Sequence, residues 1–183
     1  MSSACEVRPV ALVGLSGAGK TTMGPLLASR LGCVAIDLDA RISARAGCSI
    51  VELFAREGEA AFRGLECAEL GRAIDEGASV IACGGGIVET PGGRTLLRER
   101  CRPVWLEVGI DEAARRVGEA AVERPLLASG GVAERLRAML LRREWGYAAV
   151  AVARIPTDGL STTEVAERVA RALEALARPE SAA

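Results

Sequence analysis

The sequence predicts an α/β fold in which helices cover both faces of a five-stranded parallel sheet, a three-layer α/β/α sandwich. Two patterns predict it: short apolar runs alternate with longer stretches of helical periodicity, and a glycine-rich loop joins the first run to the first helix. Strands covered on both faces are apolar throughout, whereas strands with one exposed face alternate between apolar and polar residues. Strand–helix alternation in turn implies parallel strands joined by right-handed crossovers.

Five segments have the character of such strands. Each is short, apolar and flanked by glycine, proline or charge: residues 9–14, 33–37, 80–83, 103–108 and 148–155. The chain has 183 residues, which is long enough for one domain with a full core. We therefore expect residues 1–183 to form a single domain.

The helices between these strands are predicted from capping signals and from apolar spacing. Three capping signals mark helix starts: Ser49 with Glu52, Thr90 before Pro91, and Ser161 with Glu164. Gly58 is expected to interrupt one helix. The predicted helices cover about 19–31, 49–75, 91–100, 111–118 and 131–145, with a last helix after Ser161. That last helix carries an apolar stripe: Val165, Val169, Leu173 and Leu176.

The composition excludes several classes of function. The net charge is −1 and aromatic residues make up 3%, so the chain offers neither a basic surface nor stacking platforms for nucleic acid. No uncharged apolar stretch approaches the ~18 residues of a membrane helix, and the N-terminus lacks the pattern of a signal peptide. We therefore expect a cytoplasmic protein without nucleic-acid or membrane partners.

Histidine is absent, and none of the six cysteines forms a C-x-x-C pair. Zinc and redox motifs are therefore not expected, nor is a disulfide framework in a chain of this size without a signal peptide. Without histidine, any proton transfer must use Asp, Glu, Lys or Tyr. A metal would be a hard ion held by oxygen ligands.

The strongest motif is a phosphate-binding loop at residues 14–22, GLSGAGKTT, which fits G-x-x-x-x-G-K-[ST] between a predicted strand and helix. Its backbone N–H groups and the helix N-terminus would surround the phosphates of a nucleotide. Lys20 would reach the β- and γ-phosphates, and the Thr21 hydroxyl would ligate Mg²⁺. The expected nucleotide-binding residues of the loop are Gly17, Ala18, Gly19, Lys20, Thr21 and Thr22.

Two aspartates, Asp37 and Asp39, follow the second predicted strand. The third strand ends in VIACGGG, with glycine where many P-loop proteins carry a magnesium-orienting aspartate, and the GTPase motifs D-x-x-G and N-K-x-D are absent. In an extended chain, residues two apart project to the same face, so both carboxylates would line the crevice at the carboxyl ends of the strands. We expect Asp37 to contact the Mg²⁺ shell through water, and Asp39 to orient or deprotonate an acceptor hydroxyl. The alternative is a pair of N-cap residues for a helix from residue 40.

Other polar residues could form a site for the acceptor. Arg63 can pair with Glu66 on one helix face, although it could also be an ordinary solvated charge. The glycine triplet at residues 84–86 has no side chains to keep a ligand away, so a small molecule could lie against its backbone. Alternatively, the triplet is a flexible turn. Arg124 lies in residues 118–131, which read as a surface loop or a mobile flap, and Arg143 precedes the last strand.

Taken together, these motifs resemble the shikimate kinase family, which belongs to the nucleoside-monophosphate-kinase-like P-loop group. The resemblance covers about residues 8–157 and rests on six pieces: GLSGAGKTT, the D-x-D of AIDLD, the stretch from Gly47 to Glu66, GGG, RPLL, and R-x-x-x-Y ending at Tyr147. It implies the sheet order 2-3-1-4-5, a substrate-binding region at about 39–66 and a lid at about 116–130. It also implies ATP-dependent phosphorylation of the 3-hydroxyl of shikimate, with Mg²⁺, by a monomer.

The resemblance also implies a role for each matching residue. Asp39 is similar to the aspartate that contacts the reacting hydroxyl, and Asp37 to its magnesium-side neighbour. Arg124 resembles the lid arginine that closes on the ATP phosphates, which makes Lys20, Asp39 and Arg124 the expected catalytic residues. Arg116 is similar to the arginine that packs on adenine. The residues expected to bind shikimate are Asp39, Arg63, Gly84, Gly85, Gly86 and Arg143.

Three features depart from the family pattern, and three other functions stay open. A tryptophan, Trp145, replaces the usual proline, Cys83 replaces a common serine or threonine, and TDGLS lacks the basic or proline residue that often borders adenine. The same architecture could belong to a kinase that acts on another acidic alcohol, such as gluconate, or on a nucleoside monophosphate. It could also belong to a nucleotide-binding module without catalytic activity. ADP production with a panel of acceptors separates these possibilities.

Overall fold

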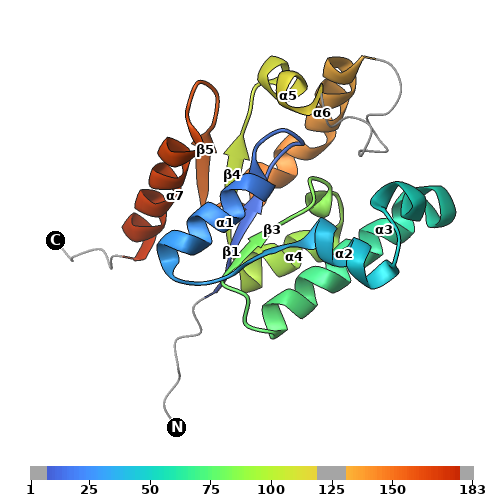
Figure 1. The fold of residues 1–183 in the computed structure, drawn as a ribbon, viewed down its shortest axis with the longest axis horizontal. Coiled ribbons are helices and arrows are strands. Elements are labelled where there is room, and N and C mark those ends of the chain that lie inside the picture. Colours follow the sequence, from blue (N-terminus) through green and yellow to red (C-terminus); the bar gives the residue numbers. More distant parts are fainter. Residues whose placement is uncertain (1–7, 119–130, 178–183) are drawn as a thin grey trace, which may run out of the picture.

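The computed structural model describes residues 8–118 and 131–177, and a five-stranded sheet forms its centre (Figure 1). The strands are β1 (Val10–Val13), β2 (Ala35–Asp37), β3 (Val80–Ala82), β4 (Arg102–Glu107) and β5 (Ala153–Pro156). They lie in the order β2-β3-β1-β4-β5 and every pairing is parallel, which confirms the predicted fold class. The chain forms β2 and β3 on one side of β1 and then crosses to β4 and β5 on the other side, so the direction of the strand order reverses next to β1. In open α/β sheets, ligands bind outside the carboxyl ends of the strands at such a point.

Helices cover both faces of this sheet (Figure 1). The helices are α1 (Lys20–Leu31), α2 (Leu38–Ala46), α3 (Ile50–Asp75), α4 (Pro91–Arg100), α5 (Ile110–Val117), α6 (Val132–Val150) and α7 (Thr162–Ala177), with the short 3-10 helix η1 (Ile87–Glu89). One face packs against α1 and α7, and the other against α3 and α4. Helix α6 contributes to both sides, because it passes the carboxyl edge of the sheet.

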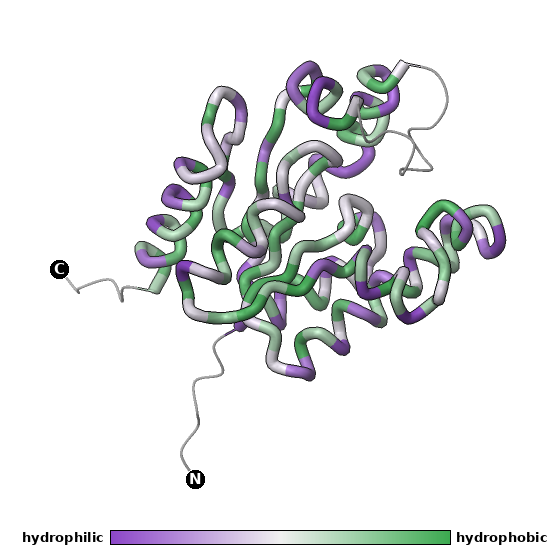
Figure 2. The backbone as a smooth tube through the Cα atoms, viewed as in Figure 1, coloured by the Kyte–Doolittle hydropathy of each residue, from purple (hydrophilic) through white to green (hydrophobic). Residues whose placement is uncertain are grey.

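The core follows the two-residue alternation of the central strand. Leu12 faces the cluster built with α1 and α7, whereas Ala11 and Val13 face the cluster built with α3, α4 and the end of α6. Figure 2 shows hydrophobic residues gathered along the strands and hydrophilic residues on the outer turns of the helices. A third, small cluster of Ile42, Leu53 and Phe62 joins α2 to the first half of α3. This cluster holds together the two helices of the region expected to bind substrate.

The predicted capping signals are confirmed. Ser49 and Glu52 form a reciprocal capping box, as do Ser161 and Glu164, and the Thr90 hydroxyl accepts a hydrogen bond from the first turn of α4. Gly58 has φ 80° and ψ 172°, which confirms the predicted break within α3. A residue with a Cβ is strained at such a φ, so glycine suits this position.

The predicted strand at 148–155 was wrong at its beginning. Helix α6 continues to Val150, and β5 begins only at Ala153. An apolar run such as AAVAVA fits a buried helix end as well as a strand, and here Tyr147 and Val150 pack into the core from the helix. The apolar stripe of α7 also ends earlier than predicted, because Leu176 is 52% exposed.

In the two described segments of the chain, no helix combines the length and the apolarity needed to cross a bilayer.

Candidate active site

The glycine-rich loop turns sharply between β1 and α1 through three glycines with positive φ: Gly14, Gly17 and Gly19. A Cβ on Gly17 would lie 2.8 Å from the carbonyl oxygen of Ala113, so only glycine lets the loop approach α5 this closely. Helix α1 begins at Lys20 and presents its N-terminus to the loop. The unpaired N–H groups and the positive end of the helix dipole favour an anion there.

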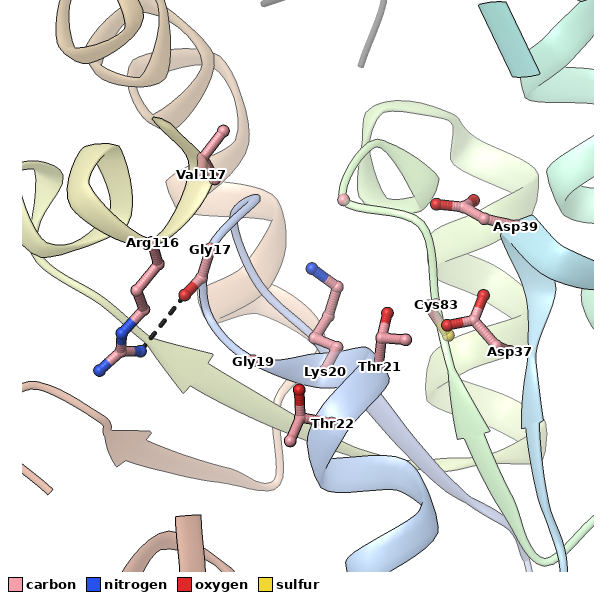
Figure 3. Close-up of a pocket in the computed structure, with 11 residues that line it drawn as sticks. Gly17, Gly19, Lys20, Thr21, Thr22, Asp37, Asp39, Cys83, Arg116 and Val117 are labelled. Atoms are coloured by element: carbon pink, nitrogen blue, oxygen red, sulfur yellow. Dashed lines mark hydrogen bonds between the residues drawn. The ribbon is translucent and has the colours of Figure 1, made fainter. Parts of the chain in front are cut away.

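A pocket of ≈ 290 Å³ opens beside this loop. It brings together residues of the loop, the ends of β2 and β3, and α5 (Figure 3). The predicted site residues that line it are Gly17, Gly19, Lys20, Thr21, Thr22, Asp37, Asp39, Gly85 and Arg116. Cys83 and Val117 line it as well. Ala18 does not: it is buried, and its N–H donates to the carbonyl of Leu15 at 3.1 Å.

Lys20 lies across its own loop. Its Nζ donates to the carbonyl oxygens of Gly14 at 2.8 Å and Leu15 at 3.0 Å. Figure 3 shows the side chain reaching into the pocket from the start of α1. The ammonium is therefore placed where the phosphates of a nucleotide on this loop would meet it.

Asp37 and Asp39 both line the pocket, but the predicted geometry between them was wrong. Asp37 ends β2 and is the N-cap of α2, where its Oδ1 accepts from the N–H of Ala40 at 3.1 Å. Asp39 lies in the first turn of α2 rather than in an extended chain. The cap turns the backbone into a helix directly after Asp37, and the first helical turn carries the Asp39 carboxylate toward the same opening (Figure 3). The alternative that Asp37 is an N-cap residue is thus correct, and Asp37 nevertheless lines the pocket.

The pocket could hold a hard cation between Thr21 and Asp37. Both line the pocket, and Figure 3 shows their side chains on facing sides of the opening; oxygen ligands of this kind suit Mg²⁺. Within residues 8–118 and 131–177, no group of three or more His, Cys, Asp or Glu side chains could hold a metal. A cation would therefore take most of its ligands from phosphates and water, which is the usual arrangement for Mg²⁺ at a nucleotide.

A second polar cluster lies beside the pocket and contains both predicted substrate arginines. Arg63 comes from α3 and donates to Glu66 at 2.5 Å and to Glu59 at 2.8 Å. Arg143 comes from α6, is 3% exposed, and donates through Nε to Glu89 at 2.6 Å. These are buried cations with fixed partners, so the interpretation of Arg63 as a solvated helix charge was wrong. Two buried guanidinium groups side by side make a site for a small anion.

The glycine triplet connects this cluster to the pocket. A Cβ on Gly84 would overlap the Glu66 carboxylate and lie 2.9 Å from Asp39 Oδ1, and a Cβ on Gly86 would overlap the Arg63 guanidinium. Gly85 lines the pocket, and its carbonyl accepts from the buried Tyr147 hydroxyl at 2.5 Å. Because the triplet has no side chains, the charged groups of Glu66, Asp39 and Arg63 can lie directly against its backbone.

Burial dominates the acid–base behaviour of Glu66, whose side chain is 1% exposed. Desolvation raises the pKa of this carboxyl from 4.5 to about 7, against the opposing charge of Arg63 and with a further contribution from the negative charge of Asp39. The positive charge of Arg143 on α6 also lowers the pKa of Glu66. Burial raises the pKa of the Tyr147 hydroxyl and of the Cys83 thiol, and the negative charge of Glu66 adds to both shifts. Glu66 is therefore close to its protonation midpoint near neutral pH.

The raised pKa of Glu66 predicts a pH-dependent loss of stability. Between pH 4.5 and about 7 the folded state binds the Glu66 proton more tightly than the unfolded state, so the free energy of unfolding should fall as pH rises through this window. The difference between the pKa of Glu66 in the folded and in the unfolded state corresponds to a loss of unfolding free energy on the order of 3 kcal/mol across this window. Urea unfolding of the wild type and of Glu66→Gln at pH 5, 6, 7 and 8 measures it.

In this experiment the stability of the wild type relative to Glu66→Gln should decline as pH rises. The exposed Glu57→Gln variant, on the same helix, should show no such change relative to the wild type. A difference between wild type and Glu66→Gln that stays constant across the four pH values would rule out the raised pKa.

Arg116 lies on the side of the phosphate-binding loop opposite to Asp37 and Asp39 (Figure 3). Its guanidinium donates to the carbonyl of Gly17 at 3.2 Å and to the hydroxyl and carbonyl of Thr157 at 3.2 and 3.0 Å, and it pairs with Glu112. It therefore ties the phosphate-binding loop to the segment before α7. The expected contact of Arg116 with adenine stays a prediction. Arg124 lies outside the described residues, and only 116–118 of the expected lid lie within them.

Sequence reasoning missed two glutamates of this site, Glu59 and Glu89. Glu89 follows GGGIV at the end of β3, so its position after a strand at the ligand-binding edge was a usable signal. Glu59 precedes Arg63 by four residues, which is the spacing of a helical ion pair.

Comparison with known proteins agrees with this geometry. The shikimate kinase family model matches residues 16–174. A shikimate kinase from Synechococcus sp. (strain RCC307) is 40% identical over 171 residues, covering 93% of this chain and 87% of that protein. The structure of shikimate kinase from Acinetobacter baumannii in complex with shikimate has a TM-score of 0.90 and 31% identity, covering 94% of this chain and 96% of that one. A gluconokinase from Sinorhizobium meliloti 1021 has a TM-score of 0.59 at 18% identity over 93% of each chain, a likeness of fold alone.

Proposed function

The chain belongs to the shikimate kinase family and phosphorylates shikimate, and from that premise we propose that the γ-phosphoryl group of ATP passes to the 3-hydroxyl in the cleft described above. One observation carries the proposal. The phosphate-binding pocket and the buried arginine pair meet at the glycine triplet, with Asp39 between them. A triphosphate and an anionic alcohol can therefore be bound next to each other.

The loop residues would bind and orient the nucleotide. Lys20 and the N-terminus of α1 would neutralise the β- and γ-phosphates, whose charge spreads over the equatorial oxygens during transfer. We assign Mg²⁺ to Thr21 and Asp37, in the second case through water. When bound, the ion would neutralise charge between the β- and γ-phosphates.

The acceptor side would be organised by Asp39 and the two arginines. Asp39 would orient the 3-hydroxyl and take its proton as the new P–O bond forms. Arg63 and Arg143 would hold the carboxylate of shikimate, lined by Gly84, Gly85 and Gly86. Holding both substrates in line would supply much of the rate enhancement, because the reaction depends mostly on positioning and charge neutralisation.

The remaining assignments extend this scheme. Arg124 would close on the phosphates from a lid at about 116–130, and Arg116 would pack on adenine while holding the loop at Gly17. Excluding water from the closed cleft would limit wasteful hydrolysis of ATP. We further propose a single kinase domain that acts as a cytoplasmic monomer.

The alternatives are less well supported. A gluconate kinase would also need an anion site, but gluconokinase is similar to this chain at the level of the fold alone. A non-catalytic nucleotide-binding module would have no need for a buried arginine pair beside Asp39.

ADP release with and without shikimate tests the function directly. With MgATP present, we expect rapid ADP release that requires shikimate, and release near the background rate with gluconate or a nucleoside monophosphate. Product analysis by phosphorus NMR should show one phosphate ester on the 3-oxygen. Equal ADP release without an acceptor, or a preference for gluconate, would contradict the proposal.

A further inference from the structure

One carboxylate joins the two buried arginines of the acceptor site. Oε1 of Glu89 accepts from Nε of Arg143 at 2.6 Å and lies 3.4 Å from Nη2 of Arg63. The three side chains come from three separate elements: η1, α6 and α3. Glu89 thus contacts both guanidinium groups through the same atom.

The position of Glu89 is fixed by the packing of η1 against α6. Its N–H donates to the carbonyl of Gly86 at 2.9 Å, which closes the short turn after the glycine triplet. Val88, the preceding residue, packs so closely on α6 that a Cβ on Gly146 would lie 3.0 Å from its Cβ. Arg94 strengthens this contact, because it donates to the carbonyl of Val88 at 2.7 Å and lies over the ring of Trp145 at 4.5 Å. The backbone beside Glu89 is thus held on both sides.

The electrostatics explain why a shared acceptor is useful. Two guanidinium groups placed close together repel each other, and each side chain has many rotamers. A carboxylate between them offsets the repulsion and restricts their orientation. Because Glu89 takes the Nε side of Arg143, the Nη1 side faces Gly85, where a Cβ would be 3.4 Å away. Gly85 lines the nucleotide pocket, so this side of Arg143 lies next to a residue of that pocket.

We propose that Glu89 is a positioning residue for the acceptor: it joins Arg143 to Arg63 so that the pair presents a preformed site to the substrate carboxylate. The proposal rests on the proposed function of the arginines and adds a residue that touches them but not the reacting atoms. It predicts an effect on acceptor binding and little effect on the chemical step. The opposite possibility is that Glu89 occupies the arginines as a competitor of the substrate carboxylate, which would reverse the sign of the effect.

The test compares Glu89→Ala, Glu89→Gln and the exposed control Glu99→Gln in steady-state ADP release. Glu89→Ala should raise the KM for shikimate about tenfold, as expected when a charge-assisted hydrogen bond that orients a binding group is lost. The KM for ATP and the kcat should stay within about threefold of the wild type, because the nucleotide side is unchanged. Glu89→Gln keeps an oxygen for Arg143 Nε and should fall between Glu89→Ala and the wild type. Glu99→Gln should match the wild type.

A double-mutant cycle distinguishes positioning through Arg143 from a general structural role. In the background of Arg143→Ala, the further change Glu89→Ala should alter the KM for shikimate less than about twofold, because the group it positions is already gone. Independent, multiplying effects would overturn the proposal. So would a KM for Glu89→Ala equal to or below that of the wild type. If Glu89→Ala fails to fold, Glu89→Gln decides the question, since unchanged KM and kcat in that folded variant would also overturn it. Failure of the wild type itself to respond to shikimate would instead reject the proposed function.

Discussion

Replacing Asp39 by asparagine should lower kcat by about 10³-fold, within the range that a general base contributes, while nucleotide binding persists. The amide has the shape of the carboxylate but cannot accept the proton of the 3-hydroxyl. Asp39 lies in the first turn of α2 and faces both the pocket and the glycine triplet, so the change acts where the two substrates meet. Lys20 and the loop that surrounds the phosphates are untouched by it.

The measurements are single-turnover phosphoryl transfer and calorimetric titration with ATP. The expected result is a dissociation constant for ATP within about threefold of the wild type, together with the large loss of rate. Asp75→Asn, whose side chain is 67% exposed at the end of α3, serves as the matched control and should retain full activity. Turnover of Asp39→Asn within tenfold of the wild type would show that Asp39 does not act on the hydroxyl.

Much of the fold could be predicted from local signals. The two capping boxes depend on residues three apart, and the five apolar runs depend on burial that any parallel sheet imposes. The start of β5 could not be predicted in this way, because Ala148, Ala149 and Val150 suit a buried helix end equally well. What decided it was the tertiary packing of Tyr147, which is invisible to a window of neighbouring residues.

In the candidate site, too, local motifs could be predicted and contacts made through tertiary packing could not. The phosphate-binding loop is a local motif, so its residues could be named from the sequence. The geometry of Asp37 and Asp39 was predicted from an extended chain, and the N-cap bond to Ala40 changed it. The partners of Arg143 could not be predicted, since Glu89 is 54 residues away and meets it only after η1 packs on α6.

Replacing Arg63 by alanine should raise the KM for shikimate about 100-fold, because one of two guanidinium groups that form charge-assisted bonds to the carboxylate is lost. The KM for ATP should change little, since Arg63 does not line the nucleotide pocket. The same steady-state assay measures both constants. Arg56→Ala, an exposed position on the same helix, is the control and should leave them unchanged. An unchanged KM for shikimate in Arg63→Ala would remove Arg63 from the acceptor site.

Arg63 also supports the fold, so affinity and stability must be separated. Its loss leaves Glu66 buried without its nearest cation, which should destabilise the protein by about 2 kcal/mol, less than a permanently charged group would cost because Glu66 can take up a proton. Arg63→Lys restores a positive charge but not the planar fork that bonds Glu66 and Glu59 at once. If the fork is what grips the substrate carboxylate, Arg63→Lys should recover most of the stability and little of the affinity. Equal recovery of both would mean that charge alone selects the acid.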